Sequence, residues 1–300
     1  MTSAAIILII ISAATHAAWN MVSKRENPSP AFFLAATTAG CACLTPVVAP
    51  YLWLTPAITG HVWLLLIATG LCQAIYYAGL AGAYKAGHLS VAYPLARSSA
   101  VLMVAAMNLS GHHFGPASLV GMALIAAGGV VLPVERWSDW KLRDYLHASS
   151  LFALMAAAGT AGYSIVDDAA LRILRSDPAM HAGRVAVTLV YALFEGLSAT
   201  VWLALIVFVG RLRRPRSEKG PSYRWSSAAL TGIGIYLSYS LVLLAMTYSR
   251  NVSYVVAFRQ LSIPIGAVLG IAVLREPRRV MKMAGVAVMV AGLVLVALRP

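Results

Sequence analysis

The chain has 300 residues and a formal net charge of +13, with 60% hydrophobic and only 11% charged residues. Soluble domains carry about 25% charged residues, so this composition excludes an ordinary soluble protein. The basic residues lie mostly in connectors between apolar stretches, and no zinc-finger spacing or RNA- or DNA-binding motif accompanies them, which excludes a nucleic-acid partner.

Ten apolar stretches follow one another along the chain, each near the roughly 20 residues that a helix needs to cross a bilayer. Open β-sheet edges cannot be satisfied in lipid, so we expect helices. A polar segment, 133–147, separates two sets of five. The predicted spans are 4–22, 31–52, 62–84, 91–109, 116–132, 150–171, 185–209, 227–248, 252–274 and 280–298.

The last stretch of each set carries the same pattern of small residues. Gly121, Ala123, Ala127, Gly128 and Val130 recur 164 positions later as Gly285, Ala287, Ala291, Gly292 and Val294. A unit of five spans is odd, so its second copy enters the membrane from the opposite side, a construction that secondary transporters use. The sequence therefore predicts an all-α membrane protein of ten transmembrane helices, arranged as two inverted five-helix repeats, residues 1–135 and 148–300.

Five ionisable residues stand out inside predicted spans: Arg97, Asp167, Asp168, Glu195 and Arg259. Such a residue costs about 2.5–3.5 kcal/mol at mid-helix on insertion scales, so each is expected to face a cavity or a partner. The two arginines fall at nearly equivalent places in the two sets and would form a fork for a carboxylate or phosphonate oxygen. Alternatively, each arginine pairs with an acid such as Glu195 and holds helices together.

Three residues are candidates for coupling transport to an ion gradient: His16, Asp167 and Glu195. Burial favours the neutral form of a carboxyl group, which suits proton exchange. Asp167 is also close to the predicted end of its span, where it would lie in headgroup water. His16 is a proton shuttle or a hydrogen-bonded structural residue.

Polar and aromatic side chains recur at helical spacing in several spans, which indicates faces that line a central path. In the first span they are His16, Trp19 and Asn20; the second copy has Thr160, Tyr163 and Ser164 at the same place. Gln73 with Tyr77, Tyr93 with Arg97, and Tyr236 with Tyr239 form similar pairs. We expect a mid-membrane substrate cavity lined by Trp19, Asn20, Tyr77, Tyr93, Arg97, Tyr163, Tyr239 and Arg259.

Short motifs mark several spans. They are His16-Ala17-Ala18-Trp19-Asn20 with Lys24, Tyr93-Pro94-Leu95, Leu274-Arg275-Glu276-Pro277, and the stretch from Gly285 to Gly292. In these motifs the chain resembles the EamA-type, ten-helix branch of the drug/metabolite transporter superfamily over essentially its whole length. One departure is His112-His113, which stands where the family has an acidic residue.

The resemblance implies a multi-pass transporter of the inner membrane, with cytoplasmic chain ends. The loop charges favour the opposite orientation, because most basic residues lie in the connectors on the other side of the membrane from the chain ends.

We expect a gradient-driven transporter, acting as an exporter, of a small organic metabolite such as an amino acid or a related zwitterion or anion. No protease, hydrolase or P-loop motif indicates an enzyme, and no cofactor or metal site is expected. The expected partners are the solute, a proton or other ion gradient and the lipid bilayer, with the chain a monomer or homodimer. The alternatives are a membrane scaffold or sensor subunit without flux, and an exporter of cationic compounds.

Overall fold

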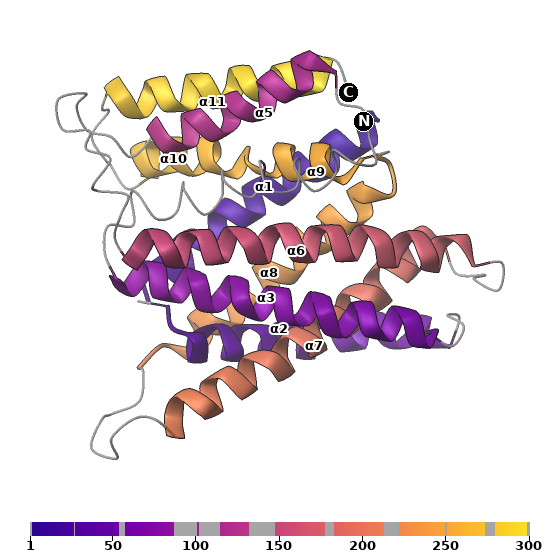
Figure 1. The fold of residues 1–300 in the computed structure, drawn as a ribbon. Helices are drawn as coiled ribbons and strands as arrows, with labels where there is room; N and C mark the ends of the chain where they lie inside the picture. The colour runs from indigo at the N-terminus through magenta and orange to yellow at the C-terminus, as the bar shows by residue number, and fades with distance from the viewer. Residues whose placement is uncertain are drawn as a thin grey trace.

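The computed structural model describes residues 2–26, 28–53, 58–86, 101, 115–131, 148–177, 183–212, 222–249, 251–273 and 280–298. Within these ranges all regular structure is α-helical, and no strand occurs. The helices lie side by side across the molecule, with both chain ends on the same side (Figure 1). They are α1 (Ser3–Lys24), α2 (Pro30–Leu52), α3 (Gly60–Ala86), α5 (Pro116–Val131), α6 (Ala148–Ser176), α7 (Arg184–Leu212), α8 (Trp225–Met246), α9 (Val252–Arg259), α10 (Ser262–Val273) and α11 (Val280–Leu298).

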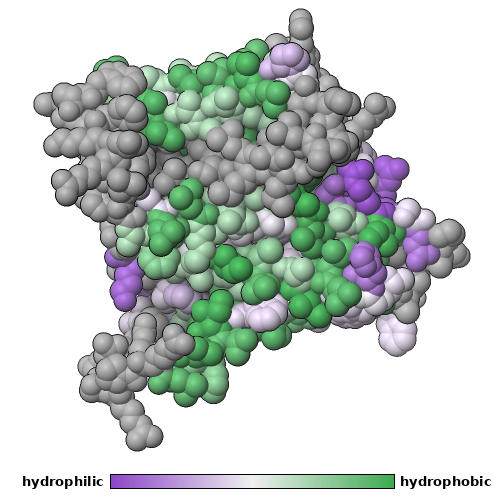
Figure 2. Space-filling model, in the orientation of Figure 1, coloured by the Kyte–Doolittle hydropathy of each residue, from purple (hydrophilic) through white to green (hydrophobic). Residues whose placement is uncertain are grey.

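Six of the described helices are long and apolar enough to cross a membrane: α1, α2, α3, α6, α7 and α8. Their outward faces carry large apolar side chains, among them Ile7, Leu151 and Val201. Figure 2 shows apolar residues over the middle of one face and hydrophilic residues towards the two ends of the helices. This is the surface of a chain that has lipid rather than water around its middle, so the protein is an all-α membrane protein.

The predicted spans agree with the helices except at two places. The fourth, 91–109, lies outside the described residues apart from Val101. The ninth, 252–274, was predicted as one helix and is interrupted: α9 ends at Arg259 and α10 begins at Ser262. Every other predicted span corresponds to one helix, with the ends of several helices extended by a few residues.

Pro264 explains the interruption of the ninth span. A proline has no backbone N–H to donate four residues back and its ring clashes with that carbonyl, here the carbonyl of Gln260. The Gln260 carbonyl instead accepts from the N–H of Ile263 at 2.9 Å. The N–H groups of Gln260 and Leu261 likewise bond three residues back, each at 3.0 Å, so the chain tightens for one turn.

Helices of the first half pack mainly on helices of the second half. α3 lies along α6, α1 along α8, and α5 along α11, while α2 contacts both α7 and α8 and α3 also contacts α7. Most of the packing between described helices therefore joins the two halves, rather than helices of the same half. The contacts between the halves enclose the polar interior described below.

Glycines bring α5 and α11 into backbone contact. A Cβ atom at Gly121 would lie 2.7 Å from the Gly292 carbonyl oxygen, and one at Gly128 would lie 2.7 Å from that of Gly285. The two pairs run in opposite directions along the helices, so α5 and α11 are antiparallel. Small residues let helix backbones approach in this way where lipid provides no hydrophobic drive.

Hydrogen bonds fasten α1 to α8 at several levels. The Thr2 N–H donates to the Tyr248 carbonyl at 3.4 Å at one end of the pair. Further along, the Ser12 hydroxyl donates to the Ser238 carbonyl at 2.7 Å, and the Trp19 indole N–H donates to the Ser238 hydroxyl at 3.2 Å. These bonds fix the depth at which Trp19 meets α8.

Glu26, just beyond α1, closes the other end of the α1–α8 pair. Its carboxylate accepts from the Arg224 backbone N–H at 3.1 Å, the Arg224 Nε at 2.9 Å and the Ser227 hydroxyl at 2.8 Å. Arg224 is the N-cap of α8 and makes no side-chain cap of its own, so Glu26 supplies the missing acceptor and places a negative charge at the helix N-terminus. The Arg224 backbone bond, then the bonds from Ser227 and the Arg224 side chain, hold the pKa of Glu26 below its ordinary value of 4.5.

We predict that Gly121→Ala lowers thermal stability, because the new methyl group meets the Gly292 backbone and the Val296 side chain. Overpacking of this kind typically costs about 1–3 kcal/mol. Gly266→Ala is the matched control, since a Cβ there has nothing within 4 Å. The midpoints of heat unfolding in detergent should differ between the two variants; equal midpoints would show that α5 and α11 separate easily.

We predict that Glu26→Gln destabilises the protein at neutral pH but not in acid. A carboxyl group whose pKa is lowered by folding contributes stability above its ordinary value, here 4.5, and loses that contribution as the pH falls through the lower folded value. The unfolding midpoints of wild type and variant should therefore converge as the pH is lowered below 4.5. Arg172→Gln, which removes an exposed ion pair with Asp168, is the control and should change little at either pH. A midpoint difference that is the same at both pH values would contradict the charged role of Glu26.

Candidate functional site

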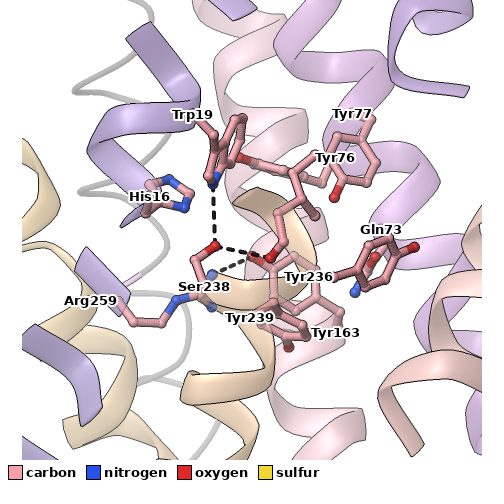
Figure 3. Close-up of a pocket in the computed structure, with 11 residues that line it drawn as sticks. His16, Trp19, Gln73, Tyr76, Tyr77, Tyr163, Tyr236, Ser238, Tyr239 and Arg259 are labelled. Atoms are coloured by element: carbon pink, nitrogen blue, oxygen red, sulfur yellow. Dashed lines mark hydrogen bonds between the residues drawn. The ribbon is translucent and has the colours of Figure 1, made fainter. Parts of the chain in front are cut away.

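A small cavity lined by polar and aromatic side chains lies between helices of both halves of the chain. Its volume is about 20 Å³, enough for one or two water molecules. Figure 3 shows His16 and Trp19 reaching it from α1 and Arg259 from α9, opposite a group of tyrosines. The lining residues are His16, Trp19, Gln73, Tyr76, Tyr77, Tyr163, Ile235, Tyr236, Ser238, Tyr239 and Arg259.

Arg259 brings the positive charge of the cavity. It is the last residue of α9, at the interruption of the ninth span, and is only 6% exposed. Its Nη2 donates to the Tyr163 hydroxyl at 3.2 Å. The guanidinium carbon also lies 5.0 Å from the ring centre of Tyr239 and 5.6 Å from that of Tyr163. Tyrosine faces attract a desolvated cation, which lets the arginine remain charged in an apolar bundle.

The α1 side of the cavity is a perpendicular pair of rings, His16 and Trp19, whose centres are 4.6 Å apart. The hydrogen bond from Trp19 to Ser238 fixes the indole against α8. The α3 side is also aromatic: Tyr77 stacks on Phe33 with ring centres 5.0 Å apart, and Tyr76 lies against Tyr163 at 6.0 Å. Such walls combine apolar ring faces with hydroxyl groups, which suits an amphipathic ligand.

Asp167 is wholly buried and does not line the cavity itself, but it is bonded to Tyr239, which does. One of its oxygens accepts from the Thr69 hydroxyl at 2.6 Å and from the Tyr191 hydroxyl at 2.7 Å. The other oxygen accepts from the hydroxyl of Tyr239, the residue whose ring faces Arg259. Three hydroxyl groups from α3, α7 and α8 thus converge on one carboxyl group of α6 and stabilise its negative charge.

Glu195 on α7 lies beside Asp167 and is 1% exposed. Its carboxyl group accepts from the side-chain amide of Gln73, which itself lines the cavity. Glu195 lies one turn after Tyr191 on α7, and Gln73 lies one turn after Thr69 on α3, so the carboxyl groups of Glu195 and Asp167 are held between the same two helix faces. Two buried carboxyl groups so placed cannot both be ionised at little cost, so the pair is a place for a proton.

The structure brings most of the predicted substrate residues together. Trp19, Tyr77, Tyr163, Tyr239 and Arg259 all line the cavity, as does His16. Asn20 is buried beside it but is not among the lining residues, because its amide turns back to the His16 carbonyl at 2.8 Å. Tyr93 and Arg97 lie outside the described residues.

The headgroup position considered for Asp167 is wrong. The sequence placed the end of the sixth span at residue 171, whereas α6 continues to Ser176, so Asp167 is inside the bundle. Asp168, by contrast, is partly exposed and pairs with Arg172 at 2.8 Å. The two adjacent aspartates therefore have different environments, which the sequence alone did not separate.

Two of the three hydroxyl donors to Asp167, Thr69 and Tyr191, were missed. Thr69 is four residues before Gln73, and Tyr191 is four residues before Glu195, so each pair shares one face of its helix. That spacing could have indicated that the polar faces of α3 and α7 extend one turn further than Gln73 and Glu195, to Thr69 and Tyr191. Nothing in the sequence, however, paired these faces with α6.

The described residues contain no group of three or more His, Cys, Asp or Glu side chains that could hold a metal ion. What the site offers instead is a guanidinium for an anionic group, hydroxyls and rings for the remainder of a small solute, and a carboxyl pair for a proton.

No known family model matches the sequence, and no curated protein is similar to it. In fold, 28 solved chains match it. One of them is a crystal structure whose name gives no function. It has a TM-score of 0.68 and 20% sequence identity, and the match covers 99% of this chain and 98% of that one. At this identity the likeness shows a shared fold over the whole chain and nothing about activity.

Proposed function

We propose that the protein is a gradient-driven secondary transporter of a small organic solute that carries a carboxylate or similar anionic group. The observation that carries this proposal is the position of Arg259. It lies at the interruption of a helix, in a small cavity bounded by helices of both halves. Secondary transporters typically place their solute site at such discontinuous helices, where two repeats meet near the middle of the bilayer.

Ten spans in two inverted repeats are part of this proposal, and the helix contacts support it. If each helix is exchanged for its counterpart, α1 with α6, α2 with α7, α3 with α8 and α5 with α11, the contact α3–α6 becomes α8–α1 and α2–α8 becomes α7–α3. The contacts α2–α7 and α5–α11 become themselves. All of these contacts occur, which is what a two-fold relation between the halves requires.

The glycine contacts follow the same exchange. The contact of Gly121 with Gly292 becomes the contact of Gly285 with Gly128, and both occur. The antiparallel course of α5 and α11 fits a repeat whose second copy is inverted. These features, with the motifs in the sequence, support our proposal that the chain belongs to the EamA-type branch of the drug/metabolite transporters.

The solute is proposed to be an amino acid or a related zwitterion, with a simple anion as the nearest variant. Arg259 would bind the carboxylate, and Tyr163, Tyr239 and Tyr77 would surround the remainder. Export of cationic compounds is less well supported, because a buried guanidinium repels a cation. No catalytic role or cofactor is assigned to any residue of the cavity.

The present cavity is too small for an organic solute, since about 20 Å³ holds little more than water. It therefore corresponds to a closed state, and transport requires the halves to separate on one side and then on the other. We place the protein in the inner membrane as an exporter with cytoplasmic chain ends, acting as a monomer or homodimer.

We predict that Arg259→Gln abolishes solute flux while the protein remains folded and inserted. Losing a hydrogen bond to a charged group costs about 1.5–3 kcal/mol, or roughly 10- to 150-fold in affinity. The assay is counterflow of radiolabelled L-amino acids and short carboxylates in vesicles containing the purified protein. Arg172→Gln, which removes a half-exposed arginine of α6, is the matched control and should transport normally.

Arg259→Lys keeps the charge and should retain part of the flux. If Arg259→Gln inserts and transports at the wild-type rate, the arginine is structural and the site is wrong. If it fails to insert, Tyr163→Phe tests the same contact with a smaller change, since it removes only the hydroxyl that Arg259 contacts.

Stabilisation by solute separates a transporter from a scaffold or sensor subunit. A ligand that binds only the folded state stabilises that state, by about 2.7 kcal/mol at 100 times its Kd, and so raises the unfolding temperature. We expect at least one L-amino acid or carboxylate to raise the midpoint of the wild type and not that of Arg259→Gln. If no compound shifts the wild type, a scaffold without a solute site becomes the better assignment.

A further inference from the structure

Asp167 and Glu195 are two buried carboxyl groups held between the same faces of α3 and α7. On α3, Thr69 donates to Asp167 and Gln73, one turn later, donates to Glu195; on α7, Tyr191 donates to Asp167 and Glu195 itself follows one turn later. Two buried carboxyl groups so placed cannot both be ionised at little cost, so one of them holds a proton. We propose that this pair is a proton site that holds one shared proton and couples proton movement to the Arg259 cavity, which rests on the transport function proposed above.

The surrounding donors decide which carboxyl group carries the charge. Asp167 accepts three hydroxyl hydrogen bonds, from Thr69, Tyr191 and Tyr239. Glu195 accepts one amide bond, from Gln73. Hydrogen bonds donated to a carboxylate favour its ionised form, so Asp167 is the anion and Glu195 the acid of the pair.

The described groups around the pair leave it with a single net negative charge opposite one positive charge. Arg259 is the cation that acts on both carboxyl groups, and the remaining neighbours are neutral thiols and phenols. Among the described residues, the titratable or charged groups facing the pair are Cys41 on α2, Cys72 and Tyr77 on α3, Tyr191 on α7, Tyr236 and Tyr239 on α8, and Arg259 on α9.

Two side chains connect this pair to the cavity. Tyr239 lines the cavity, presents its ring to Arg259 and donates its hydroxyl to Asp167. Gln73 lines the same cavity and donates to Glu195. A ligand that shifts either side chain therefore changes the hydrogen bonding of the pair directly.

Charge makes the proton and an anionic solute bind together. A carboxylate at Arg259 neutralises the cation that faces the pair, so the pair then holds its proton more firmly. If the pair loses its proton, both carboxyl groups are negatively charged near Arg259, and their charge disfavours binding of an anionic solute to this arginine. This coupling is reciprocal: the solute favours protonation by the same factor by which the proton favours the solute. Proton and solute therefore cross in the same direction, so net export proceeds when the outward solute gradient exceeds the opposing proton gradient.

The step makes and breaks only an O–H bond. A carboxylate oxygen of the pair takes a proton from water on one side of the membrane and returns it to water on the other. No electron moves, and no other reactant is needed.

Infrared spectroscopy of the purified protein tests the proton site without a solute. We expect a carboxylic-acid C=O band that disappears as the pH is raised and is absent in the double variant Asp167→Asn/Glu195→Gln. Asp168→Asn, one residue away in a partly exposed ion pair, is the control and should keep the band. A wild type without a titrating band, or a double variant that keeps it, would overturn the proposal.

Tyr239→Phe serves if the double variant does not fold. It keeps the ring against Arg259 and removes only the hydroxyl donated to Asp167. Losing this stabilisation of the anion should move the disappearance of the band to higher pH. An unchanged titration curve would show that the band does not come from this pair.

Flux separates this inference from the transport function itself. In vesicles supplied with radiolabelled L-amino acids, an imposed pH gradient should drive accumulation by the wild type. The double variant should lose this response to the gradient, and Asp168→Asn should keep it. Absence of any wild-type flux contradicts the transport function, while the infrared result still tests the proton site. Wild-type flux that ignores the pH gradient, or follows sodium instead, contradicts the coupling alone.

Discussion

Charged groups inside an apolar bundle have to be compensated by other protein groups, and this constraint organises the centre of the molecule. Asp167 takes hydroxyl bonds from three other helices, and Arg259 lies between two tyrosine faces. With Glu195 and Gln73 added, the network joins α3, α6, α7, α8 and α9 at one level. Because each group stabilises the next, removal of one leaves an uncompensated partner in a medium of low dielectric constant.

Hydrogen bonds of this kind also hold the two halves together around the cavity. Thr69 to Asp167 joins α3 to α6, Gln73 to Glu195 joins α3 to α7, and Trp19 to Ser238 joins α1 to α8. Each of these bonds links a helix of the first half to one of the second. Any widening of the cavity between the halves must therefore break at least one of them. The glycine contacts of α5 and α11 involve backbone atoms and leave little room for sliding.

The sequence could predict the helices because length, hydropathy and connector chemistry are local. The break in the ninth span was missed although Arg259 and Pro264 were visible. Proline kinks in membrane helices are accommodated by neighbouring groups whose positions no sequence pattern gives. Helical spacing correctly grouped side chains that share one helix face and line the cavity, such as Tyr236 and Tyr239. Asn20 shares such a face with His16, yet bonds to its own helix.

By itself the sequence determined an all-α membrane protein, the place of each described helix and the side chains costly enough to require a polar interior, because these follow from transfer free energies and periodicity. Only the tertiary structure decided which charges meet. Asp167 and Glu195 lie 28 positions apart, Thr69 and Asp167 lie 98 apart, and Arg259 reaches Tyr163 across 96. Such contacts depend on how helices of the two halves pack against one another. The residue pattern of a single helix shows which face is polar but not which helix that face meets.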